Sequence, residues 1–123
     1  METSVLYLGR ILFGGYFAFN GINNLKMLDF MSGYAKSKGT PMPKLSVVVS
    51  ALLLLFGGLS VLFDILPSLG LISLVLFLIP VTLIIHPFWK VQDPMEKMAE
   101  MINFMKNIAL LGAVLMLLAG KLV

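Results

Sequence analysis

The chain has 123 residues, of which 59% are hydrophobic and only 12% are charged. A soluble domain has about a quarter of its residues charged, and one this small could not bury so much apolar surface, so the composition excludes a soluble globular domain and a disordered chain. The net charge of +3 comes from basic residues beside apolar segments. We therefore expect these residues to meet membrane lipid headgroups and not nucleic acid. The absence of cysteine excludes disulfides, thiol redox chemistry and cysteine-ligated metals.

Four apolar segments approach the roughly 20 residues that a helix needs to cross a bilayer. They run over about residues 5–25, 45–63, 67–86 and 102–120. The helical pattern of the fourth begins earlier, where Asp93-Pro94 is typical of an N-cap followed by a first-turn proline. The sequence therefore predicts an all-α, integral membrane four-helix transmembrane bundle, with residues 1–123 as a single membrane domain.

The distribution of lysines between the connections predicts the orientation in the membrane. The first and third connections hold Lys26, Lys36, Lys38, Lys44, Lys90 and Lys97. The opposite side offers only Lys121. By the positive-inside rule we expect a multi-pass protein of the cell membrane whose first and third connections are cytoplasmic and whose termini both lie outside.

Both cytoplasmic connections have a helical pattern. In the first, Leu25, Leu28, Met31 and Ala35 recur at helical spacing, and Gly39 suits the position just after a helix end. The third begins the long helical pattern at Pro94. We therefore expect short interfacial helices in the first and third connections.

Arg10 is the only charged residue deep within a predicted span. Placing a charged side chain at the centre of the bilayer costs several kcal/mol of free energy. Arg10 can snorkel outward or form a structural ion pair with Asp64, which the predicted topology places at the same membrane face. The alternative is a buried cation that positions an anionic or carbonyl-bearing ligand, which makes Arg10 a candidate ligand-binding residue.

A second group of polar residues is predicted near the cytoplasmic ends of three helices. Asparagine amides and an imidazole N–H can donate hydrogen bonds to a ring carbonyl, and histidine can exchange a proton near neutral pH. The residues are Asn20, Asn24, His86, Trp89 and Asn107. We predict that His86, Asn20 or Asn24, Asn107 and Trp89 bound one polar ligand pocket. Helix caps, interhelical hydrogen bonds and interfacial anchoring explain the same residues without a ligand.

No catalytic residue or metal ligand can be assigned from the sequence. The chain has no nucleotide loop, nucleophile elbow or metal-binding helix motif. Asp93, Glu96 and Glu100 are interleaved with lysines, so we expect them on a solvated, salt-bridged surface.

Several short motifs, in order along the whole chain, resemble the DoxX family of small four-helix membrane proteins. They are Gly9-Arg10-Ile11-Leu12-Phe13 with Phe19-Asn20-Gly21-Ile22, Tyr34-Ala35-Lys36-Ser37-Lys38-Gly39-Thr40-Pro41, Phe56-Gly57-Gly58-Leu59-Ser60, and His86-Pro87-Phe88-Trp89 through Asp93-Pro94 to Asn103-Phe104-Met105-Lys106-Asn107. The family takes its name from subunits that resemble those of a terminal quinol oxidase, and related proteins are linked to thiosulfate:quinone oxidoreductase activity. The resemblance implies an accessory or quinone-associated subunit of a membrane redox system without its own metal centre. It also implies quinone or quinol as the ligand and a redox partner subunit.

A different class of function fits the same residues. The polar residues that point into the bundle can serve the packing of the helices or line a path for a solute. Such residues occur in a non-enzymatic structural, scaffold or small-solute transport protein. The sequence leaves open whether the protein is an enzyme. Membrane lipid and further copies of the chain are candidate partners in either class.

Overall fold

The computed structural model describes residues 2–122, and the side chains of residues 2–120. This part of the chain forms α1 (Glu2–Lys26), α2 (Leu28–Ser37), α3 (Pro43–Phe63), α4 (Pro67–Ile85), the 3-10 turn η1 (Phe88–Lys90) and α5 (Pro94–Leu122). The helices α1, α3, α4 and α5 are long and apolar enough to cross a membrane. The predicted all-α fold with four spanning helices is therefore confirmed. The side chain of Lys121, which entered the prediction of orientation, lies outside the described residues.

Prolines mark the starts of three spanning helices. Pro43, Pro67 and Pro94 are the first residues of α3, α4 and α5, where a missing N–H costs no helical hydrogen bond. At α5 the Asp93 carboxylate accepts the backbone N–H of Glu96 at 3.0 Å, as the predicted N-cap requires. The predicted segment 102–120 is thus the later part of a 29-residue helix, about 44 Å long.

The first connection contains a short helix, α2, whose end is defined by Gly39. Gly39 has a φ of +84°, a left-handed conformation that glycine adopts without strain. Its N–H donates to the Lys36 carbonyl at 3.0 Å, and the Thr40 N–H donates to the Ala35 carbonyl at 3.1 Å. These two bonds form a Schellman motif, which turns the chain toward α3. The third connection contains only the turn η1 before α5, and the location of both connections at the membrane interface stays a prediction.

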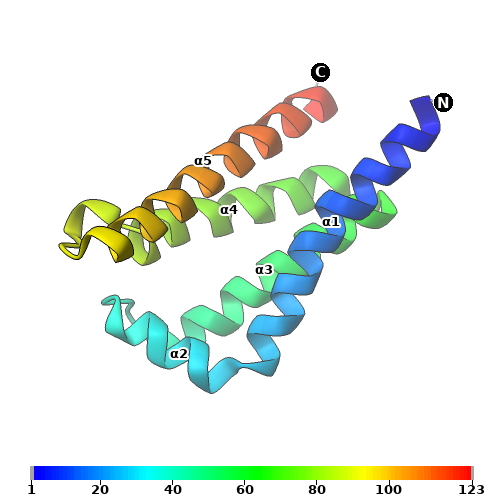
Figure 1. Cartoon of the computed structure of the whole chain (residues 1–123). Helices are drawn as coiled ribbons and strands as arrows, with labels where there is room; N and C mark the ends of the chain where they lie inside the picture. The colour runs from blue at the N-terminus through cyan, green and yellow to red at the C-terminus, as the bar shows by residue number, and fades with distance from the viewer. Residues whose placement is uncertain (1, 123) are drawn as a thin grey trace.

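The spanning helices pack in the order α1, α3, α4, α5, each against the next, and α2 packs against α3. Figure 1 shows the two chain ends at one end of the bundle, with α2 and the α4–α5 connection at the other end. The polar candidate residues at the ends of α1 and α4 and on α5 therefore lie at the end of the bundle opposite the chain termini.

Two kinds of contact hold the spanning helices together. Between α1 and α3 the backbones touch, because a Cβ added to Gly14 would lie 2.7 Å from the Gly58 carbonyl oxygen. All four spanning helices then share one apolar cluster whose side chains are at most 2% exposed. The cluster consists of Phe17, Leu54, Leu71, Leu74, Leu78 and Val114. Phe17 from α1 and Val114 from α5 complete this cluster across the bundle.

Candidate functional site

Arg10 and Asp64 lie at the end of the bundle near the chain termini. Arg10 Nη1 is 3.2 Å from Asp64 Oδ2, and the two side chains are 18% and 45% exposed. Asp64 caps the end of α3 in the left-handed conformation, with a φ of 55°, which aspartate tolerates better than most residues. This is the geometry of the expected ion pair, and it separates Arg10 from the other candidate residues.

A cavity of about 450 Å³ lies in the opposite half of the bundle, where the helices meet α2 and the connections. Four of the sequence candidates, Asn20, Asn24, His86 and Asn107, line it. They come from α1, the end of α4 and α5, as the topology predicted. Trp89 is not among its lining residues. The indole is half-exposed and packs edge-on against Phe88 and Phe104, with ring centroids 5.4 and 5.6 Å away.

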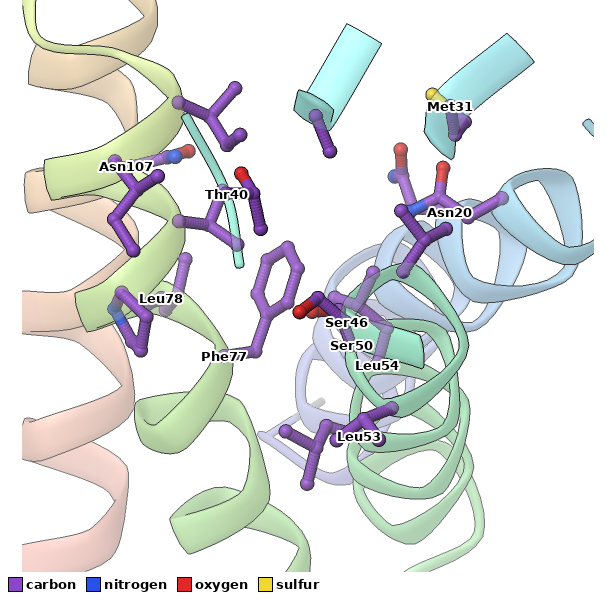
Figure 2. Close-up of a pocket in the computed structure, with 18 of the residues that line it drawn as sticks. Asn20, Met31, Thr40, Ser46, Ser50, Leu53, Leu54, Phe77, Leu78 and Asn107 are labelled. Atoms are coloured by element: carbon purple, nitrogen blue, oxygen red, sulfur yellow. The ribbon is translucent and has the colours of Figure 1, made fainter. Parts of the chain in front are cut away.

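The polar side chains of the cavity wall lie mostly toward the α2 end, where apolar side chains such as Ile84 and Ile85 also line it, and the rest of the wall is mainly apolar. The polar part includes Asn20, Asn24, Thr40, Ser46, His86 and Asn107. The apolar part includes Phe17, Leu54 and Leu78, which also belong to the core cluster. In Figure 2 the amide of Asn107 is directed toward Thr40, and Asn20 lies on the opposite wall beyond the ring of Phe77. The arrangement suits an amphiphilic ligand with a polar head near the connections and an apolar part among the helices.

Several polar groups of the wall are sheltered from solvent. Asn107 is only 6% exposed, and the Thr40 hydroxyl is buried without a hydrogen-bond partner within the protein. Asn20 is less sheltered, and its side-chain N–H donates to the Tyr16 carbonyl at 2.7 Å in an exposed hydrogen bond. A buried hydroxyl without a partner is costly, so a ligand or water that bonds Thr40 would lower the free energy of this site.

The hydrogen-bond partner of His86 differs from the sequence expectation. His86 Nδ1 lies 2.9 Å from Glu100 Oε2, and not against an asparagine amide. The expectation that Glu100 lies on a solvated surface was also wrong, because its side chain is only 14% exposed. The end of α4 covers α5 at Glu100, whereas Asp93 and Glu96 are exposed as expected. Among the described residues, His, Asp and Glu side chains form no group of three that could hold a metal ion.

Tyr34 of α2 interacts with Glu100, the hydrogen-bond partner of His86. Partial burial raises the pKa of the Tyr34 phenol above its ordinary value of 10.0, and the charge of Glu100 and a hydrogen bond with its carboxylate add to the rise. Sequence reasoning missed both Tyr34 and Glu100 as site residues. The spacing of Glu100 and Asn107, seven residues apart and hence on one helix face, was the signal that could have placed Glu100 on the inward side.

Comparison with known proteins gives one family. The DoxX family model matches residues 5–87, which cover α1 to α4 and include Asn20, Asn24 and His86. Glu100 and Asn107 on α5 follow the matched part. No curated protein and no solved structure gives a significant match to the chain.

Proposed function

The chain is a member of the DoxX family of membrane proteins, and from this premise we propose that it is an accessory subunit of a membrane redox system that holds a lipid-soluble quinone or quinol. The ligand occupies the cavity lined by Asn20, Asn24, His86 and Asn107. The protein has no metal centre of its own in this proposal. Electrons reach or leave the ligand through a partner subunit in the membrane.

The polar-to-apolar change along the cavity wall is the observation that carries this proposal. A quinone has a ring with two oxygen atoms and an apolar tail, so it needs hydrogen-bonding groups at one end of its site and apolar surface at the other. Asn107 and His86 supply the first, and Phe17, Leu54 and Leu78 supply the second. A volume of about 450 Å³ lies within the usual range for small-molecule sites.

The packing of the core favours a binding site over a path for solutes. The cavity wall includes Phe17, Leu54 and Leu78, each 1% exposed. These side chains belong to the cluster that joins all four spanning helices. A solute path would have to open this cluster, whereas a bound ligand only has to rest against it.

Direct binding tests the proposal. The native protein in lipid nanodiscs, freed of endogenous quinone, is titrated with a decyl-substituted benzoquinone. We expect saturable binding with one ligand per chain. Asn107→Ala should weaken this binding by roughly three- to tenfold, the effect of one lost hydrogen bond. Asn103→Ala removes an amide on the same helix that does not line the cavity, so this matched control should bind like the native protein.

Two results would contradict the proposal. One is the absence of saturable binding by the native protein. The other is undiminished binding of both the benzoquinone and its hydroquinone by Asn107→Ala and by His86→Ala, each shown to be folded by its helical circular dichroism. Solute flux through protein-containing liposomes, together with either result, would support the transport alternative instead.

A further inference from the structure

His86, Glu100 and Tyr34 connect three separate elements at the polar end of the cavity. Glu100 on α5 bonds His86 at the end of α4, with an Nδ1–Oε2 distance of 2.9 Å, and it also interacts with Tyr34 on α2. The His86 and Glu100 side chains are 17% and 14% exposed. His86 and Tyr34 both line the cavity, whereas Glu100 does not. An effect of Glu100 on a ligand in the cavity would therefore pass through His86 or Tyr34.

The bond to Glu100 determines what His86 can offer a ligand. An ionised carboxylate only accepts hydrogen bonds, so the proton between the two groups belongs to His86 Nδ1. In the neutral imidazole the other nitrogen, Nε2, then carries a lone pair and accepts hydrogen bonds. A phenol is a hydrogen-bond donor to a carboxylate, so Tyr34 suits the ionised form of Glu100 as well.

We propose that Glu100 is a positioning residue that holds His86 with its proton on Nδ1, so that Nε2 accepts a hydrogen bond from the hydroxyl of a bound quinol. This inference rests on the proposed function and specifies the redox form that the cavity prefers. A quinol hydroxyl donates to Nε2, whereas a quinone carbonyl, which only accepts, meets an unfavourable lone pair there. The asparagine amides do not discriminate in this way, because an amide both donates and accepts.

The first experiment reads the position of the proton without any ligand. The chain contains one histidine, so protein labelled with 15N-histidine and purified without a histidine tag gives the signals of one imidazole. At pH 8 we expect a protonated Nδ1 and a bare Nε2. Glu100→Gln should move the population toward the form with the proton on Nε2, because the Gln amide can donate to Nδ1. The proton on Nε2 in the native protein would overturn the inference.

Glu96→Gln is the matched control for this substitution. Glu96 lies four residues before Glu100 on α5, is exposed, and does not line the cavity. Its replacement removes the same charge from the same helix and should leave the imidazole signals unchanged. Identical imidazole spectra for Glu100→Gln and the native protein would count against a positioning role for Glu100.

The second experiment compares the affinities for the two redox forms. The decyl-substituted benzoquinone and its hydroquinone, the latter kept reduced under argon, are titrated into the native protein, Glu100→Gln and Glu96→Gln. We expect the native protein and Glu96→Gln to bind the hydroquinone about tenfold more tightly, and Glu100→Gln to lose most of this preference. Equal affinities for both forms in the native protein would overturn the inference and leave the proposed function standing. Binding of neither form would overturn both.

Discussion

At the scale of single residues, the ion pair with Asp64 explains how α1 accommodates the charge of Arg10. The Arg10 side chain is largely buried, at 18% exposed, and its guanidinium lies 3.2 Å from the Asp64 carboxylate. Asp64 itself is 45% exposed, so solvent screens the pair and its net contribution to stability is about 1 kcal/mol or less. The cost of removing one partner is larger than this where the remaining charge is buried.

Replacement of Arg10 tests this account. Arg10→Ala should lower the melting temperature in detergent by a few degrees, because the pair is lost and so is the packing of the arginine stem. Lys26→Ala, at the other end of α1 and exposed, is the control and should melt like the native protein. Equal melting temperatures for the two variants would mean that Arg10 is satisfied by snorkelling alone.

At the scale of elements, the contact between α1 and α3 depends on the lack of side chains at a few positions. A Cβ on Gly14 would lie 2.7 Å from the Gly58 oxygen and 2.7 Å from the Leu62 nitrogen, and one on Gly21 would lie 2.8 Å from the Ala51 oxygen. These neighbours are backbone atoms, so a side chain could enter only if the helices moved apart. Close approach through small residues is a usual way for membrane helices to pack without a hydrophobic driving force between them.

Adjacent glycines of α1 provide a matched pair of variants. Gly14→Ala should destabilise the protein by about 1–3 kcal/mol, the usual cost of overpacking, and should disturb the α1 wall of the cavity. At Gly15 an added Cβ meets nothing within 4 Å, so Gly15→Ala should leave stability unchanged or raise it slightly through helix propensity. Thermal unfolding of both variants in the same detergent measures the difference. Similar losses of stability for the two would argue against a direct α1–α3 backbone contact.

At the scale of the whole molecule, the arrangement of the helices leaves two orientations in the membrane. Figure 1 places both chain ends at one end of the bundle and α2 at the other. The excess of lysines in the first and third connections predicts that the α2 end, which is the end where the cavity lies, faces the cytoplasm.

Single cysteines decide between the two orientations, because the chain has none of its own. In intact cells an impermeant thiol reagent should label Thr3→Cys, near the start of α1, and should leave Lys36→Cys on α2 unlabelled until the cells are opened. Both positions are exposed in the structure, so a failure to react would not come from burial within the protein. The reverse pattern of labelling would place the α2 end of the bundle outside.

The sequence by itself determined the fold class and the end of the bundle at which each polar residue lies. Hydropathy and helix length identify a membrane span locally, because a helix satisfies its own backbone hydrogen bonds. Successive spans alternate in direction, which brings Asn20, Asn24, His86 and Asn107 to one end and pairs Arg10 with Asp64 at the other. These placements need only the order of the spans along the chain.

The tertiary structure alone decided which side chains touch around the cavity. The partnership of His86 with Glu100, the approach of Tyr34 and the exclusion of Trp89 from the cavity depend on how α5 is rotated against α4, η1 and α2. A rotation of one residue, about 100°, moves a side chain from lipid to the bundle interior. The spacing of Glu100 and Asn107 placed both on one face of α5, and only the structure showed that this face is covered at Glu100. In the structure Val114 of α5 packs in the core cluster, and Glu100, 14 residues earlier and near the same helix face, is covered at the end of α4, where His86 is its hydrogen-bonding partner.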